Sequence, residues 1–145
     1  MRVLIGFIFA LTSSLTSAAW VIHNISTDQE VFFYYDSDSI ERLDDVIKVQ
    51  ELANYPNAKT QPRSAILTNY YDCQTRTKKL YQIDNYSGFM AIGDRISREM
   101  DADASWEPIT NAKSINANIL NILCGVMDYR KMFVESFVKT CEDTQ

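Results

Sequence analysis

The chain has 145 residues, of which 46% are hydrophobic and 12% aromatic, enough to build the core of one folded domain and to exclude an intrinsically disordered chain. The formal net charge of −5 argues against nucleic-acid binding, which needs a clustered basic surface. The composition therefore indicates one acidic domain whose partner is not a nucleic acid.

The first nineteen residues have the order of a secretory signal peptide. Arg2 gives a positive start, an apolar run follows at 3–11, and small residues end the segment at 17–19. The alternative is a membrane anchor, but this run is far shorter than the ~20 residues needed to span a bilayer. We also expect no transmembrane segment in the mature chain and no lipid attachment at the cleavage site, where no cysteine lies. The sequence therefore predicts an exported protein, either periplasmic or on the outer surface.

Export places the cysteines in an oxidising compartment, where they pair. The chain has three, Cys73, Cys124 and Cys141, so one disulfide and one remaining thiol are expected. Cys73 ends an apolar stretch and Cys124 lies in another, whereas Cys141 lies in a polar tail, so we predict a Cys73–Cys124 bridge. A single histidine and the lack of a C-x-x-C motif argue against a metal site and against thiol redox chemistry.

Apolar runs separated by turn residues predict a series of short strands. We expect strands at 20–24, 31–36, 46–53, 64–73 and 79–86, with shorter extended segments at 39–42 and 89–92. Within 46–53, Ile47 and Val49 alternate with polar residues and should face the core. Asp44-Asp45 predicts a hairpin turn, and the segment 55–63, with its two prolines, predicts a surface loop.

A helix is expected near the C-terminus. Ser114 has the character of an N-cap, and apolar residues follow it at helical spacing through Val126. Gly125 either ends this helix or weakens its interior, so the apolar tail could be a second helix or a continuation of the first. Several strands followed by one helix predict an α+β domain with a mainly antiparallel sheet of short strands and hairpins. The disulfide would tie the C-terminal helix to this sheet.

The sequence contains no recognisable catalytic constellation. His23 is the only histidine, no Gly-x-Ser-x-Gly motif surrounds a serine, and a histidine beside the first strand is expected to be packed. Neighbouring aspartates lie in turn-like segments, where aspartate commonly bonds its own backbone: Asp36 with Asp38, Asp44 with Asp45, and Asp101 with Asp103. We therefore predict no catalysis and no cofactor.

Two loops are the candidate partner-binding segments. Loops on a rigid scaffold commonly carry recognition, which favours the 55–63 loop and the 74–78 turn. The candidate residues in these segments, or directly beside them, are Tyr55, Arg63, Arg76, Lys78 and Lys79. The alternative for the three basic residues near this turn is a solvated hairpin tip without a ligand.

Three segments, taken together, resemble a known family. They are Tyr34–Arg42, the Tyr71-Asp72-Cys73 strand end followed by Arg76 and Leu80, and Trp106-Glu107-Pro108-Ile109 followed by Ser114 and Leu123-Cys124. This pattern, with the opening Trp20-Val21, is similar to the surface-adhesin protein E family of bacterial exported proteins. The resemblance covers roughly residues 20–124. It implies a small α+β domain with an antiparallel sheet, and it supports the Cys73–Cys124 bridge.

The resemblance divides the chain into a signal peptide at 1–19, a family-like domain at 20–125 and a C-terminal extension at 126–145. It implies a non-catalytic adhesin-like module that contacts a protein partner, such as a host matrix or envelope protein. The alternatives are a structural periplasmic envelope protein and a periplasmic enzyme accessory. The chain departs from the family in having no lipid-acceptor cysteine after the signal and in carrying the extra tail with Cys141. The sequence indicates neither the ligand nor the oligomeric state.

Overall fold

The structure, a computed structural model, describes residues 18–26, 28 and 30–125. Eight strands, two short 3-10 helices and one α-helix occupy these residues. In chain order they are β1 (Trp20–Ile25), β2 (Phe32–Asp36), η1 (Ser37–Ser39), β3 (Glu41–Leu43), β4 (Val46–Asn54), β5 (Ser64–Asp72), β6 (Thr77–Tyr86), η2 (Phe89–Ala91), β7 (Arg95–Met100), β8 (Glu107–Pro108) and α1 (Ile115–Leu123).

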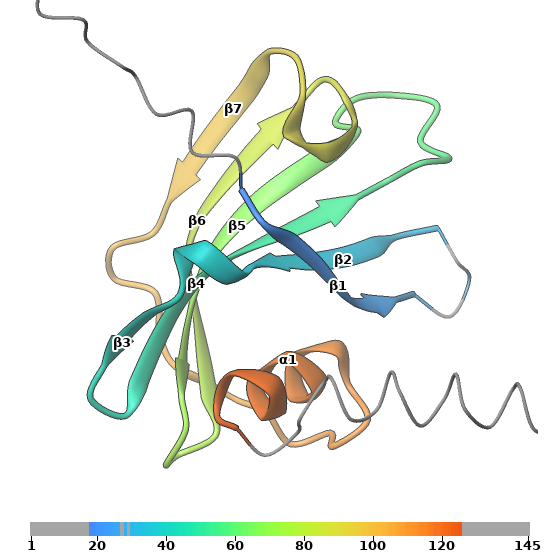
Figure 1. The fold of residues 1–145 in the computed structure, drawn as a ribbon. Coiled ribbons are helices and arrows are strands. Elements are labelled where there is room, and N and C mark those ends of the chain that lie inside the picture. Colours follow the sequence, from blue (N-terminus) through green and yellow to red (C-terminus); the bar gives the residue numbers. More distant parts are fainter. Residues whose placement is uncertain (1–17, 27, 29, 126–145) are drawn as a thin grey trace, which may run out of the picture.

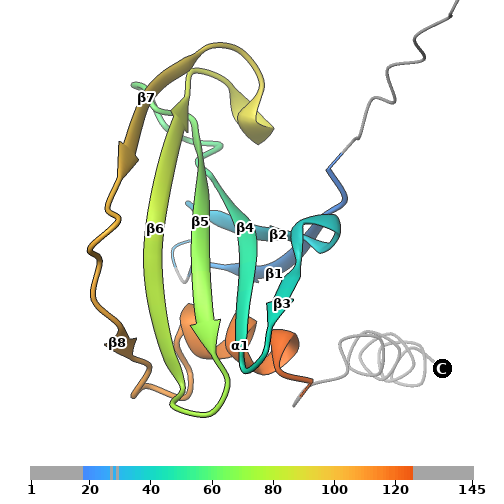
Figure 2. The same ribbon diagram turned by 90° about the vertical axis from the view of Figure 1, so that its left-hand side faces the viewer.

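The strands form one antiparallel sheet, as the sequence predicts. The order is β1-β2-β4-β5-β6-β7, with β3 also paired to β4 and β8 also paired to β6. The three longest strands, β4, β5 and β6, form the curved centre of the sheet (Figure 1, Figure 2). Tight turns join β3 to β4 and β5 to β6, and such turns can connect only antiparallel neighbours. The fold is therefore the α+β architecture expected from the sequence.

Helix α1 packs on one face of the sheet, which we call the inner face; the opposite side is the outer face (Figure 2). Ile47 and Val49 of β4 point to the inner face and are 1% and 0% exposed, as their alternation predicted. The residues buried with them come from β5 and α1: Tyr71, Ile119, Leu120 and Leu123. Apolar side chains at alternate positions of the strands and at helical spacing on α1 thus pack together in one core.

Both ends of α1 have clear chemical causes. The Ser114 hydroxyl accepts a hydrogen bond from the backbone N–H of Ala117 at 3.1 Å, which confirms the expected N-cap. At the other end Gly125 has φ = 73°, a left-handed conformation that suits glycine and stops a helix. The helix therefore ends before Gly125 and does not run through it. The expected second helix and Cys141 lie outside the described residues.

The expectation of an extended segment at 89–92 is wrong, because Phe89–Ala91 form the 3-10 helix η2. Met90 and Ala91 have φ values of 54° and 58°, which no strand allows. Polar side chains of the neighbouring strands hold this conformation: Asn54 Oδ1 accepts from Met90 N, and the Ser64 hydroxyl accepts from Ala91 N, both at 3.0 Å. Tertiary hydrogen bonds therefore override the apolar pattern here.

Two strands, β7 and β8, lie in a segment whose sequence shows no strand pattern. Nearly all side chains of β7 are exposed, so this edge strand has no buried face to produce an apolar alternation. The start of the segment expected at 39–42 also differs, since Ser37–Ser39 form η1 and the strand begins only at Glu41. Residues 1–17 of the predicted signal peptide lie outside the described residues.

Candidate binding surface

An open groove of about 380 Å³ crosses the outer face of the sheet. Its lining residues come from β3, β4, β5, β6 and the segment just before β8: Leu43, Val46, Tyr70, Lys79, Tyr81 and Trp106. We call this feature the outer groove. It lies at the same end of the sheet as α1, on the opposite face, and the elements that carry it face the viewer in Figure 2.

Strand register explains why these side chains point outward. Tyr70 pairs with Lys79 on β6, whereas its neighbour Tyr71 points to the inner face and is fully buried. On the far side of the groove, β8 pairs Glu107 with Lys78, which leaves Trp106 on the alternate face. The β3–β4 hairpin places Leu43 directly opposite Val46. Alternation along four strands thus gathers these residues on one surface.

The outer groove exposes apolar side chains to solvent. Trp106 is 43% exposed and Leu43 is 52% exposed. Tyr70 and Tyr81 contact each other edge to face, with ring centroids 6.0 Å apart. Large aromatic side chains gathered in an accessible depression are typical of protein-interaction sites, where Trp and Tyr are enriched among the residues that dominate the binding energy.

A buried polar network lies behind this surface, on the inner face. Glu51 accepts hydrogen bonds from Asn69 Nδ2 at 2.7 Å and from the Tyr71 hydroxyl at 2.6 Å. His23 Nε2 lies 3.6 Å from the Glu51 carboxylate, a polar contact longer than a hydrogen bond. His23 and Glu51 are each only 4% exposed, and Asn118 of α1 donates to the backbone oxygen of His23. Because these groups are buried from solvent, the structure indicates a stabilising role for the network.

The pKa directions in this network follow from burial and from its hydrogen bonds. Burial alone would raise the pKa of Glu51, but the neighbouring His23, the Lys78 charge and the Tyr71 hydroxyl together lower it below the ordinary value. Burial raises the pKa of Tyr71 well above its ordinary value, and the nearby Glu51 charge raises it further. The stable form is therefore an ionised glutamate that accepts from a neutral tyrosine.

Two of the three aspartate pairs bond their own backbone, as their turn context predicts. Asp36 Oδ1 accepts from the backbone N–H of Asp38 at 3.0 Å, and Asp101 Oδ1 accepts from that of Asp103 at 3.1 Å. Among the described residues, no group of three His, Cys, Asp or Glu side chains is arranged to hold a metal ion. Within the same part of the chain, no helix has the length and apolar character needed to cross a membrane.

The candidate residues from the two loops do not form one cluster. Tyr55 and Arg63 close the 55–63 loop, where Tyr55 N donates to Arg63 O at 2.9 Å. Arg76, Lys78 and Lys79 lie at the opposite end of β5, whose nine residues span about 27 Å. The loop and the turn are therefore separate surfaces.

The three basic residues of the second group also have different surroundings. Arg76 donates to Asn121 at 3.1 Å and Lys78 donates to Asn116 at 3.2 Å, so both side chains contact α1. Lys79 points to the opposite face and lines the outer groove. Lys79 is therefore the one sequence candidate that the structure brings together with Trp106 and the tyrosines.

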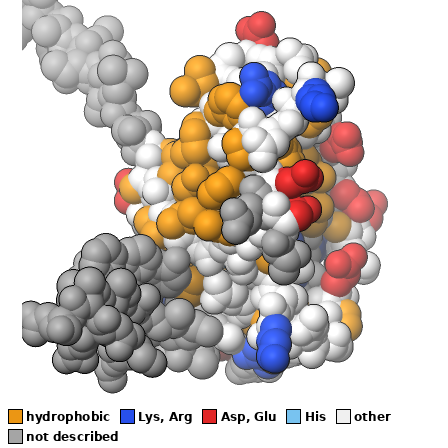
Figure 3. Space-filling view, turned by 90° about the vertical axis from the view of Figure 1, so that its right-hand side faces the viewer, with side chains coloured by type: hydrophobic (Ala, Val, Ile, Leu, Met, Phe, Trp, Pro, Cys, Tyr) orange, Lys and Arg blue, Asp and Glu red, His pale blue; other side chains and the backbone are white. Residues whose placement is uncertain are grey.

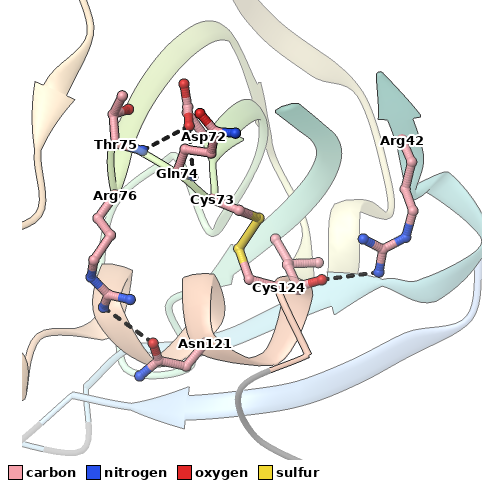
Figure 4. The surroundings of a disulfide bond; sticks show 9 residues. Arg42, Asp72, Cys73, Gln74, Thr75, Arg76, Asn121 and Cys124 are labelled. Carbon is pink, nitrogen blue, oxygen red and sulfur yellow. Dashed lines mark hydrogen bonds between the residues drawn. A yellow bond between two sulfur atoms is a disulfide. The ribbon is translucent and has the colours of Figure 1, made fainter. Parts of the chain in front are cut away.

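The disulfide joins Cys73 to Cys124, as the sequence predicts. Cys73 directly follows β5 and Cys124 caps α1, so the bond fastens the end of the helix to the end of the strand (Figure 4). Arg42 supports the same helix end by donating to the backbone oxygen of Leu123 at 3.0 Å. The outer groove is thus built on a firmly held end of the sheet.

A second apolar area lies where the ends of β1 and β2 approach the 55–63 loop. Figure 3 shows hydrophobic side chains gathered on this side of the molecule, with acidic side chains along one border. A small pocket there, about 180 Å³, is lined in part by Val31 and Tyr55. Burial raises the pKa of Tyr55, and Arg63 lies 3.8 Å from the ring centroid of Phe89. Tyr55 and Arg63 thus hold the base of their loop.

The sequence-based candidates omit Trp106, Tyr70, Tyr81 and Leu43. Tyr70 and Tyr81 lie in strands, where aromatic side chains usually belong to the core. Trp106 lies in a polar segment for which the sequence predicts neither a strand nor a helix. The available signal was Trp106 itself, because a tryptophan outside any apolar run has no obvious place in a core.

Comparison with known proteins identifies a family for this chain. The family model described as surface-adhesin protein E matches residues 20–125. The chain belongs to the surface-adhesin protein E family. Membership places it among exported, adhesin-like surface proteins. No curated protein sequence gives a significant match.

Solved structures of protein E from Haemophilus influenzae have the same fold. One matches with a TM-score of 0.51 at 17% identity, covering 72% of this chain and 83% of that one. Another, protein E from a non-typeable strain, matches with a TM-score of 0.50 at 18% identity, covering 81% of this chain and 82% of that one. At this level of identity the likeness concerns the fold, which agrees with the antiparallel sheet and helix described above.

Proposed function

We propose that this protein is an exported, non-catalytic binding module that contacts a protein partner through the outer groove. The observation that carries the proposal is the gathering of Trp106, Tyr70 and Tyr81 around an open groove on a rigid sheet. Membership in the surface-adhesin protein E family supports an adhesive role. Host matrix proteins and envelope proteins are the candidate partners. The buried network around Glu51 supports the non-catalytic part of the proposal, because its only histidine is enclosed.

Replacing Trp106 by alanine is expected to weaken partner binding about tenfold, because an interface tryptophan commonly contributes well over 1 kcal/mol. Leu43→Ala should act in the same direction with a smaller effect. Both side chains are exposed, so the free energy of unfolding should stay nearly unchanged. The measurement is binding of residues 20–145 to surfaces coated with extracellular-matrix extract or with bacterial envelope extract.

The matched control is Ile92→Ala, which removes a 70% exposed apolar side chain outside the groove. This variant should bind like the unmodified protein. Deleting residues within the 55–63 loop tests the other candidate surface in the same assay. If the Trp106 and Leu43 variants bind normally while the loop deletion does not, the 55–63 loop is the site and the outer groove is not.

The mature protein is expected to begin at Ala19 or Trp20. The small residues that end the predicted signal peptide motivate this position, and the family match begins at Trp20. N-terminal sequencing of protein recovered from the producing cells measures it, and protease treatment of intact cells separates the outer surface from the periplasm. A mature chain that still begins at Met1 would contradict export.

A further inference from the structure

The outer groove combines its aromatic surface with a single positive charge. Lys79 is the only charged side chain among the six described residues that line it. Its ammonium group makes one long contact, 3.5 Å to the backbone oxygen of Ala102, at the limit of a hydrogen bond. The other polar groups of the lining are the Tyr70 and Tyr81 hydroxyls and the Trp106 indole N–H. The lining therefore offers mainly hydrogen-bond donors and one cation.

The nearest other lysine on the outer face is already paired. Lys48 lies next to Tyr70 on the β4 side, as Lys79 does on the β6 side. Its ammonium group donates to both carboxylate oxygens of Glu41, at 3.1 and 3.2 Å. No such carboxylate faces Lys79 among the described residues that line the groove. The charge that remains available for a ligand is thus that of Lys79.

The neighbouring pocket has the opposite character. It shares Tyr81 with the outer groove and has a volume of about 350 Å³, but its charged lining residues are Glu99, Asp101 and Glu107. An anionic group would be repelled there and attracted in the outer groove. The contrast separates the two depressions by charge and points to different ligand chemistry in each.

We propose that the outer groove binds an extended apolar segment of a protein partner that carries a carboxylate, with Lys79 contacting this carboxylate. The inference rests on the proposed function and specifies the partner of the same site. The groove runs across β3, β4, β5, β6 and the segment before β8, a distance of about 19 Å, which suits about six extended residues. Apolar or aromatic residues of the segment would pack on Tyr70, Tyr81 and Trp106. The carboxylate would complete the hydrogen bonding of Lys79.

An array of eight-residue peptides tests this assignment. Each peptide carries a central Glu, Gln or Lys flanked by combinations of Leu, Phe, Tyr and Pro, and residues 20–145 are applied in labelled form. We expect retention on a subset of the Glu peptides, weaker retention on the Gln counterparts and least on the Lys counterparts. For the best Glu peptide, the dissociation constant should be about fivefold lower than for its Gln counterpart, as expected for one partly exposed charge pair.

The variants Lys79→Met and Lys48→Met separate the charge contribution from packing. In Lys79→Met the fivefold preference for Glu should disappear, whereas Lys48→Met should keep it. Raising the salt concentration from about 0.05 M to about 0.5 M should shrink the preference in the unmodified protein. Trp106→Ala should weaken the binding of the Glu peptide and of its Gln counterpart by the same factor.

Other outcomes overturn the inference in distinguishable ways. Equal binding of Glu and Gln peptides, with both lost in Trp106→Ala, would refute the role of Lys79 and leave the proposed function intact. Binding of a sulfated polysaccharide that depends on Lys79 and not on Trp106 would replace the peptide by a polyanion. If no peptide binds and the Trp106 variant is also normal on matrix and envelope surfaces, both proposals fail.

Discussion

Replacing Cys73 and Cys124 together by alanine is expected to lower the free energy of unfolding by about 4 kcal/mol in the chain-entropy model. The two cysteines are 51 residues apart in sequence, so the bridge removes much of the freedom of the unfolded chain. The native state also loses the bond that fastens α1 to β5. Denaturant unfolding of the unmodified and double-variant proteins, under non-reducing conditions, measures the difference.

Cys141→Ala is the matched control, since it removes a cysteine from the polar tail and should change stability little. Non-reducing peptide mapping should recover Cys73 linked to Cys124. Recovery of Cys73 linked to Cys141 would contradict the structure. A double variant as stable as the unmodified protein would show that packing and the contact from Arg42 to Leu123 suffice to hold the helix.

Replacing Glu51 by alanine is expected to cost about 3 kcal/mol of stability. The change removes the acceptor for Asn69 and Tyr71 inside the core, and a buried donor left without a partner costs about 1–3 kcal/mol. The matched control is Glu99→Ala on β7, where the glutamate side chain is exposed and a small effect is expected. Thermal or denaturant unfolding of both variants gives the comparison.

The Glu51 network also predicts a direction for the pH dependence of stability. The pKa of Glu51 in the folded protein is lower than the ordinary value of 4.5, so the folded state binds this proton less readily than the unfolded state. Its contribution is therefore present above about pH 4.5 and is lost as the pH falls through the lower folded-state value. Unfolding curves across this window should show a loss of stability that is smaller in Glu51→Gln. An identical pH profile in both proteins would rule out this role.

Much of the fold could be predicted from sequence because its signals are local. Alternation at Ile47 and Val49, the aspartates of the β3–β4 turn and the Ser114 N-cap each act within a few residues. The disulfide followed from the apolar context of two of the three cysteines. The tail from residue 126 and the division of the chain around the domain stay predictions.

The predictions failed where distant contacts decide the conformation. Asn54 and Ser64 hold η2 in a left-handed turn that its apolar sequence does not suggest. Strand β7 has an exposed sequence and exists because β6 offers it backbone partners. The sequences of η2 and β7 alone therefore do not contain the information that decides their conformation.

The sequence by itself predicts an export signal, and it determined the antiparallel class, the disulfide and the absence of an obvious catalytic motif. Only the tertiary structure decided which side of the molecule carries a candidate site. Lys78 and Lys79 are adjacent in sequence, yet Lys78 contacts Asn116 on the inner face, whereas Lys79 lines the outer groove with Trp106. The reason is physical: successive strand residues point to opposite faces, and the neighbours on each face come from strands far apart in the chain.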